Sequence, residues 1–156
     1  MSNIEKRLVE LGITLPSVSG PSPLADHINV KRSGDFLFFS GVGPIRDGMP
    51  LYTGRLVKNL KHEQGYDAAM EATLNLISIL KNEIGDLDKV EEIVQLVGYV
   101  ASDDDFYDQH MILNGASHLL NEIFEEKGKH ACVAIGANVL PFNVPVILNL
   151  IVKVKL

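Results

Sequence analysis

The side chains that could do chemistry are scattered along the chain and form no known catalytic motif. The five histidines are His27, His62, His110, His118 and His130. None has the His-Glu-x-x-His spacing of a zinc protease. His110 and His118 are eight residues apart, two turns along a helix, so one metal ion could not bind both. The histidines therefore predict no metal site.

Two further clusters have ordinary structural explanations. Gly41 and Gly43 are not a phosphate-binding loop, because neither a third glycine nor a Gly-Lys-Ser/Thr sequence follows before a helix. Acidic residues occupy 103–105, just before a predicted helix, where carboxylates interact favourably with the helix dipole. These patterns predict a turn and a helix start.

The single cysteine, Cys132, excludes an internal disulfide and a cysteine-based zinc site. It lies in a predicted strand and has two interpretations. One is a small core residue, since free cysteine is among the most buried residue types. The other is a thiol that lines a pocket, with His130 on the same strand face as the one local group that would lower its pKa.

Composition and charge restrict the class of protein. The 156 residues, 46% hydrophobic and 22% charged, predict one globular domain over 1–156, with 1–27 as an N-terminal extension. Fourteen basic against 20 acidic residues, a net charge of −6, disfavour a nucleic-acid partner. The longest apolar tract, 144–152, contains Asn149 and is too short to cross a bilayer. The N-terminus also lacks the apolar centre of a signal peptide. We expect a cytoplasmic protein with no membrane partner.

Hydrophobic periodicity predicts the elements that must position these side chains. A short helix starts after Ser2 and ends at Gly12, and a loop covers 16–23. The predicted strands are 28–32, 36–40, a short one at 51–55, 90–101, 130–137 and 144–155. Long helices are predicted at 63–83 and from the acidic run at 103–105 to Gly128. This order predicts an α+β fold of two layers, a mixed sheet with two long helices on one face.

The last predicted strand suggests an oligomer. One of its faces is entirely apolar and consists of Val144, Val146, Leu148, Leu150, Val152 and Val154. The other is half apolar and consists of Pro145, Ile147, Asn149, Ile151, Lys153 and Lys155. The strand at 36–40 is likewise apolar on both faces. Because the helices can cover only one face, we expect another subunit to cover the second.

Four segments together resemble a known family. They are Phe-Phe-Ser-Gly-Val-Gly-Pro at 38–44, Glu-Gln-Gly-Tyr-Asp-Ala-Ala at 63–69, Leu-Asn-Gly-Ala-Ser at 113–117, and the Leu-Pro turn at 140–141. In this order and spacing they resemble the YjgF/Rid family, formerly called endoribonuclease L-PSP. The resemblance spans about residues 28–154 and is greatest to the longer members with an extra N-terminal helix.

The resemblance implies a fold and an activity. It implies a chorismate-mutase-like fold, a homotrimer with a central barrel of sheets, and a small-ligand pocket in each cleft between subunits. It also implies hydrolysis of reactive enamines and imines to 2-oxo acids and ammonia, with no metal and no cofactor. The implied trimer agrees with the two apolar faces of the last strand.

The sequence departs from the family at the two positions that carry this chemistry. The family has an arginine eight residues before the leucine of the Leu-Pro turn and a glutamate seven residues after it. Counted from Leu140, these positions are Cys132 and Ile147. A shifted alignment does not restore either residue, because no arginine follows Arg55 and no glutamate follows Glu126. We therefore expect weak or absent deamination of imino acids.

The remaining pocket positions match the family. Ser40 and Gly41 correspond to its Ser-Gly at the pocket edge, and Asn114 to its helix asparagine, although a strand-end turn and a surface helix residue would explain them equally simply. Three functions stay open: a binding protein with an uncharged cleft, a hydrolase of uncharged imines or one that uses Lys129, and an RNA-cleaving translation inhibitor. The acidic charge disfavours the third.

Overall fold

The computed structural model describes residues 2–18 and 25–155 of the chain. The predicted loop at 16–23 lies mostly outside these residues. The described part contains, in order, α1 (Asn3–Glu10), β1 (Val30–Ser33), β2 (Phe36–Phe39), β3 (Ile45–Arg46), β4 (Met49–Pro50), α2 (His62–Ile84), β5 (Val90–Ala101), α3 (Gln109–Phe124), β6 (Ala131–Ala137) and β7 (Val146–Val154). Short 3-10 turns lie at Leu87–Lys89, Glu125–Gly128 and Pro141–Asn143. The predicted α+β class and the N-terminal helix are confirmed.

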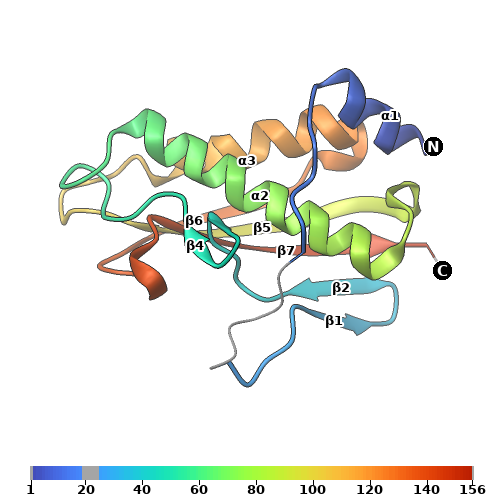
Figure 1. The fold of residues 1–156 in the computed structure, drawn as a ribbon, viewed down its shortest axis with the longest axis horizontal. Coiled ribbons are helices and arrows are strands. Elements are labelled where there is room, and N and C mark those ends of the chain that lie inside the picture. The colour runs from blue at the N-terminus through green and yellow to red at the C-terminus, as the bar shows by residue number, and fades with distance from the viewer. Residues whose placement is uncertain (1, 19–24, 156) are drawn as a thin grey trace.

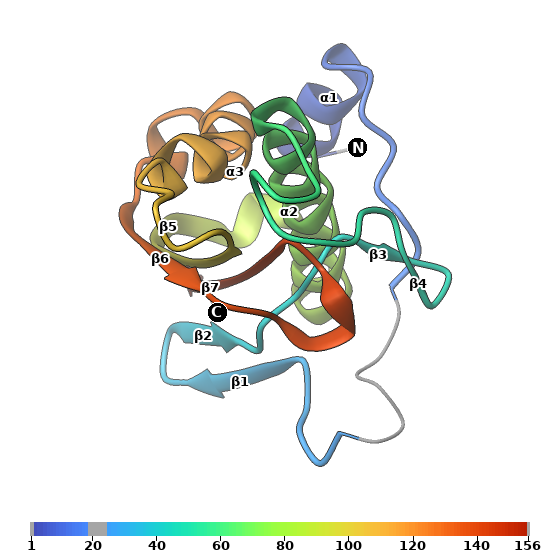
Figure 2. The same ribbon diagram turned by 90° about the vertical axis from the view of Figure 1, so that its left-hand side faces the viewer.

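Five strands form one mixed sheet in the order β1-β2-β7-β5-β6. β5 and β6 are parallel, and the other neighbours are antiparallel. Figures 1 and 2 show α2 and α3 side by side on one face of this sheet. α2 packs against β7, and α3 packs against β5 and β6. Since α3 connects the parallel strands β5 and β6, it lies over the β6 edge of the sheet.

The core lies between the helices and the sheet. Along β7 the burial alternates without interruption, and all six residues of the predicted apolar face are buried. On α2 the buried positions recur at helical spacing, from Ala68 and Ala72 to Leu76 and Leu80. Fully burying one such Val or Leu side chain contributes about 1.5–3 kcal/mol, so the two matching stripes hold the layers together.

The opposite face of the sheet is apolar and open in the single chain. Phe36 and Phe38 of β2 and Val133 and Ile135 of β6 are each between 38% and 44% exposed. Half-buried side chains lie between these edges on β5 and β7 (Val97, Tyr99, Ile147, Asn149, Ile151 and Lys153). Residues in register across the strands share a face. We call this surface the open sheet face.

α1 is held to the domain by a carboxylate at its N-terminus. Asp88 accepts hydrogen bonds from the backbone N–H groups of Asn3 and Ile4, both at 2.9 Å. Those two bonds hold the pKa of Asp88 below its usual value. Ser2 also caps the helix, as the sequence predicts, by accepting from the N–H of Glu5 at 3.2 Å.

The predicted short strand at 51–55 is wrong. The chain instead forms a hairpin of β3 and β4, with Ile45 paired to Pro50 and Arg46 to Met49. Asp47 and Gly48 make its two-residue turn with φ values of 53° and 77°. A turn with two positive φ angles is the type that joins antiparallel strands, and Asp-Gly is among its preferred sequences. The pairing therefore lies around Asp47-Gly48 and not after it.

The start of α3 also differs from the prediction. The acidic run at 103–105 does not cap the helix, because the N–H of Phe106 donates to the carbonyl of Asp103 in a separate turn. α3 begins at Gln109, with Asp108 at the N-cap position. The turn at Asp103–Phe106 lengthens the connection between β5 and α3 by several residues and places Phe106 in the core.

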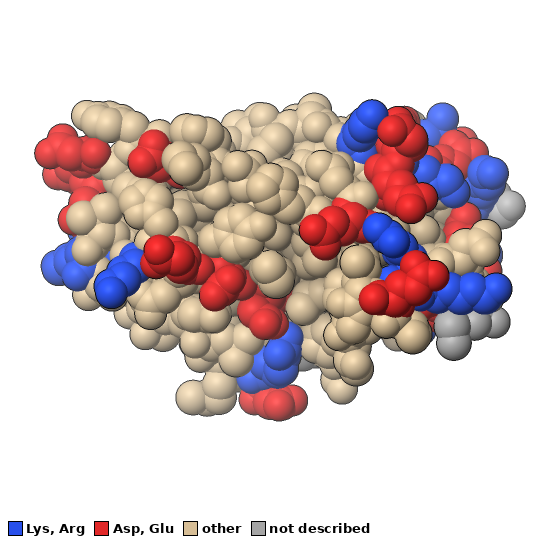
Figure 3. Space-filling model, turned by 90° about the horizontal axis from the view of Figure 1, so that it is seen from above, with Lys and Arg blue, Asp and Glu red and all other residues tan. Residues whose placement is uncertain are grey.

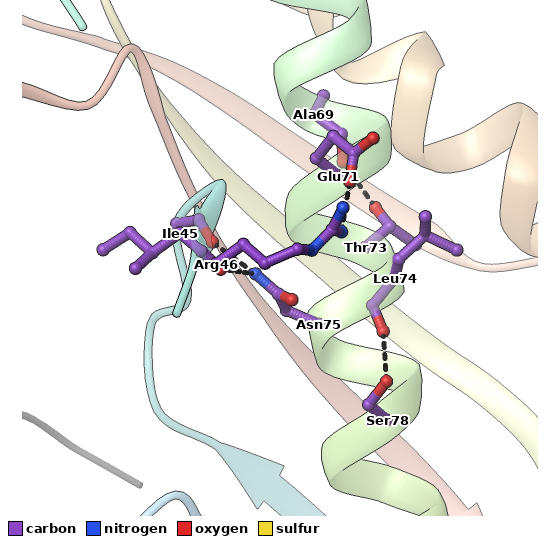
Figure 4. Close-up of polar contacts among 9 residues, drawn as sticks. Ile45, Arg46, Ala69, Glu71, Thr73, Leu74, Asn75 and Ser78 are labelled. Carbon is purple, nitrogen blue, oxygen red and sulfur yellow. Dashed lines mark hydrogen bonds and ion pairs between the residues drawn. The ribbon is translucent and has the colours of Figure 1, made fainter. Parts of the chain in front are cut away.

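Polar contacts from α2 fix the hairpin that follows the Gly-x-Gly segment (Figure 4). The side-chain amide of Asn75 donates to the carbonyls of Gly43 and Ile45, at 3.0 and 2.8 Å. The Arg46 guanidinium pairs with Glu71 at 2.5 Å. Asn75 and Glu71, one turn apart on α2, thus fix the position of the β3–β4 hairpin that follows residues 40–42.

Candidate functional site

Cys132 lies on the helix-facing side of the edge strand β6. It is in register with Leu96 of β5, which is in register with Leu150 of β7. Both leucines are buried beneath the helices, so Cys132 points toward the same layer. Among the described residues β6 has a strand neighbour on one side only, so this edge is not fully covered, and Cys132 is exposed. The interpretation of Cys132 as a core residue is therefore wrong for the single chain.

A serine and a histidine meet beside Cys132. Ser117 Oγ of α3 lies 2.8 Å from Nε2 of His130, and Nδ1 of His130 lies 2.6 Å from the carbonyl oxygen of Gly128. Both side chains are half-buried. We call Ser117, His130 and Cys132 the β6-edge cluster.

Gly128 makes this arrangement possible. A Cβ atom at Gly128 would lie 2.3 Å from the carbonyl oxygen of Leu120 and 3.1 Å from the Cα of Asn121. These are backbone atoms of α3, so a side chain here would push the turn away from the helix. The close approach lets the turn fold back on α3 and presents the Gly128 carbonyl to His130.

The thiol of the β6-edge cluster is neutral under ordinary conditions. Although Cys132 as a residue is exposed at the edge, the atoms packed around its sulfur partly desolvate it and raise its pKa, and the neighbouring Ser117 hydroxyl lowers it by a smaller amount. The cluster also lacks the composition of a metal centre: within residues 2–18 and 25–155, no group of three His, Cys, Asp or Glu side chains is placed to hold an ion. The arrangement can supply a hydroxyl, an imidazole base and a neutral thiol.

Asn114 lies close to this cluster on α3. It is one helical turn before Ser117, and residues three apart share a helix face. Its side chain is half-buried. Asn114 therefore supplies a polar amide next to Ser117 at the edge of the helix layer.

Ser40, Gly41 and Ile147 form a separate group on the open sheet face. The Ser40 hydroxyl donates to the carbonyl of Ile28 at 2.5 Å, and its N–H donates to the carbonyl of Asn29 at 2.9 Å. A Cβ atom at Gly41 would lie 2.7 Å from Cγ2 of Ile147. Gly41 thus allows the chain to pass directly over Ile147.

The structure does not bring the two groups together within one chain. Ile147 lies between the buried residues Val146 and Leu148, so its side chain points to the face opposite Cys132. Ile147 is in register with Tyr99, and Cys132 with Leu96, three residues away along β5. A cleft lined by both groups would need residues from two subunits.

Sequence reasoning missed the contact between Ser117 and His130. Ser117 belongs to the Leu-Asn-Gly-Ala-Ser segment, and His130 was connected only with Cys132. Thirteen residues separate the pair, with the end of a helix and a turn between them. The one available signal was Gly128, which marks the turn that brings the strand back along the helix.

A surface depression lies between the N-terminal ends of α2 and α3. It has a volume of about 330 Å³ and is lined by His62, Glu63, Tyr66, Asp67, Met111 and Ile112. The surrounding side chains already bind one another. His62 Nε2 lies 3.5 Å from Asp108, and the Tyr66 hydroxyl lies 3.0 Å from His118 Nδ1.

Acidic side chains are prominent on the helix side of the molecule (Figure 3). In this view a row of acidic side chains crosses the middle of the face, and acidic and basic side chains are interspersed at its right-hand end (Figure 3). Acidic residues recur at every fourth position along α2, at Glu63, Asp67 and Glu71. In the described part of the chain, no helix has the length and apolarity needed to span a bilayer.

Comparisons with known proteins match the chain over nearly its full length. Residues 5–154 match the family model described as "YjgF/chorismate mutase-like, putative endoribonuclease". Protein TCP17 of Trypanosoma cruzi is 34% identical over 153 residues, which are 97% of this chain and 94% of that protein. The structure of Atu1372 from Agrobacterium tumefaciens, a protein "with unknown function", aligns with a TM-score of 0.89 and 35% identity over 97% of this chain and 92% of its own. A "putative endoribonuclease" from Shewanella oneidensis aligns with a TM-score of 0.92 and 33% identity over 98% of this chain and 100% of its own.

Proposed function

Because the chain belongs to the YjgF/Rid family, we propose that it forms a homotrimer whose clefts bind a small uncharged ligand, and that it lacks the family's usual imino-acid deamination. The observation that carries this proposal is the neutral thiol of Cys132 at the position where the family resemblance places an arginine.

The open sheet face supports the homotrimer. Its exposed apolar residues lie on β2 and β6, near opposite edges of the sheet, with Ile147 and Ile151 between them. Soluble monomers rarely expose a contiguous apolar surface of this kind. Packing three such faces around one axis removes them from water. It also provides a second subunit, which a cleft lined by both Cys132 and Ile147 needs.

The electrostatics of the β6-edge cluster support an uncharged ligand. An arginine would hold a carboxylate by two charge-assisted hydrogen bonds. Each is worth about 1.5–3 kcal/mol, so the loss of both weakens carboxylate binding by a factor of roughly 10²–10⁴. A neutral thiol offers no compensating charge. Removal of a general base costs a further factor of about 10²–10⁴ in rate, and Ile147 cannot act as one.

The surface position of Lys129 argues against it as a replacement for the missing arginine. Its ammonium lies 2.9 Å from the Glu126 carboxylate, and its side chain is 70% exposed. A lysine paired in this way on the surface is a solvated residue. This contact disfavours the alternative in which Lys129 serves an active imine hydrolase.

The test is ammonia release from 2-iminopropanoate generated in solution. We expect the natural protein to match buffer, and Cys132→Arg combined with Ile147→Glu to gain activity. Each single variant serves as a control, because it restores only the carboxylate clamp or only the glutamate. Turnover by the natural protein clearly above buffer would overturn the proposed loss of deamination.

A further inference from the structure

Ser117 and His130 have the geometry of an activated nucleophile. A backbone carbonyl can only accept a hydrogen bond, so the contact with Gly128 places a proton on Nδ1 of His130. In the neutral ring, Nε2 is then an acceptor, and the Ser117 hydroxyl donates to it across 2.8 Å. A nucleophile within hydrogen-bond reach of a base, which is itself oriented by a third group, is the arrangement that activates serine.

We propose that Ser117 is a nucleophile and His130 its general base, and that the cleft at the β6 edge takes uncharged acyl esters. This inference rests on the proposed function, because it names the class of uncharged ligand for the same cleft. It adds a covalent reaction that the family resemblance does not imply.

The pair is held in place from both sides and is open to solvent. Ser117 belongs to the third turn of α3, whose neighbours Ala116 and Leu120 are buried. His130 directly precedes β6 and is oriented by the carbonyl of Gly128. Because Gly128 packs against the backbone of α3, the carbonyl cannot move independently of the helix that carries Ser117. Both side chains are nevertheless half-exposed at an open edge.

The surroundings favour a neutral substrate. The neighbouring groups are the neutral thiol of Cys132 and, one turn away, the amide of Asn114. The nearby cation, Lys129, is paired with Glu126. A carboxylate or phosphate substrate would find no counter-charge among these groups, whereas an ester loses little by leaving water.

In this proposal, donors for the developing negative charge come from the edge strand. β6 pairs with β5 on one side, and in the described chain no strand pairs with its other side. An edge strand presents unpaired backbone N–H groups along its free side. Backbone N–H groups directed at a carbonyl oxygen stabilise the oxyanion of acyl transfer.

The chemical steps balance without a further reagent. Ser117 Oγ attacks the ester carbonyl carbon while its proton moves to Nε2 of His130, and the carbonyl oxygen becomes an oxyanion. When the oxyanion collapses, the bond to the alcohol oxygen breaks, and that oxygen takes the proton from His130. Water then attacks the acyl-serine with His130 as base. The acid product leaves, and Ser117 recovers its hydroxyl.

The experiment uses p-nitrophenyl acetate with the full chain. We expect a burst of p-nitrophenolate and an acetyl group on Ser117, located by mass spectrometry of peptides after an acid quench. Ser117→Ala should abolish the burst because it removes the nucleophile, and His130→Gln should lower the burst rate at least about a hundredfold, the usual contribution of a general base. His118→Gln is the matched control, since that histidine is exposed on the same helix and binds Tyr66, and it should leave the rate unchanged.

The acetylation site in the unaltered protein decides the inference, however the variants fold. Absence of acetyl from Ser117, or acetyl on Cys132 alone, would overturn it, as would an undiminished burst in His130→Gln. The concentration dependence separates this result from the proposed function. An acylation rate that saturates with ester concentration supports the binding cleft. A rate that rises linearly with ester concentration, with Ser117 still acetylated, supports Ser117 as the nucleophile and counts against the cleft.

Discussion

Replacing Gly115 by alanine should destabilise the protein through the contact between the two long helices. A Cβ atom at Gly115 would lie 2.1 Å from the carbonyl oxygen of Tyr66 on α2. Real Cβ contacts essentially never fall below 3.0 Å, so the helices must separate by at least the difference, 0.9 Å. Both partners are helix backbone, which cannot rotate away. Overpacking of this kind costs about 1–3 kcal/mol, and alanine recovers only about 1 kcal/mol of helix propensity.

The matched control is Gly65→Ala in α2. There the Cβ would meet the terminal methyl groups of Leu56 and Ile112, at 2.8 and 3.0 Å, and flexible methyl groups can move. We expect Gly65→Ala to stay within about 1 kcal/mol of the natural protein, since propensity offsets the repacking. Because rigid backbone puts the overpacking cost of Gly115→Ala at the upper end of that range, the variant should lose about 2 kcal/mol after the gain in propensity, a fall in Tm of roughly 4–8 °C for a chain of this size.

Urea unfolding followed by circular dichroism measures both variants at one protein concentration, because assembly makes apparent stability depend on concentration. Equal midpoints for the two variants, or a more stable Gly115→Ala, would refute the argument that a rigid backbone contact decides the outcome.

Three further predictions concern the N-terminal helix, the thiol and the assembly. Asp88 has a lowered pKa, so the stability that it gives to the docking of α1 is complete at pH values above the ordinary aspartate pKa and is lost as pH falls through the folded-state pKa. α1 should therefore become protease-sensitive in acid. Asp88→Ala should show the same sensitivity at pH 7 and should lower the free energy of unfolding by about 0.5–2 kcal/mol. Cys132 has a raised pKa, so it should react with iodoacetamide more slowly than a free thiol at neutral pH; a faster reaction than free cysteine would contradict the burial argument. Phe38→Asp on the open sheet face should convert the proposed trimer to monomers in sedimentation, whereas Val57→Asp, exposed elsewhere, should not.

Local patterns predicted most of the fold, and the errors have specific causes. β5 and the faces of β7 follow from alternating hydrophobicity, because one fully buried face leaves a single acceptable register. The strand predicted at 51–55 was wrong because the turn at Asp47 and Gly48 pairs the residues directly on either side of it, Ile45–Arg46 with Met49–Pro50. α3 starts later than predicted because a hydrogen bond between Phe106 and Asp103 forms a turn first, a choice that depends on burying Phe106.

By itself, the sequence determined the α+β class, the residues that face the core and, through four spaced segments, the family. These depend on periodicity and on motifs within short stretches of chain. Only the tertiary structure placed Cys132 and Ile147 on opposite faces of the sheet and brought His130 against Ser117. The physical reason is that periodicity assigns a residue to one face of its own element. Which groups then touch depends on how closely a turn such as Gly128 lets the next element return, and that is decided by backbone packing between elements distant in sequence.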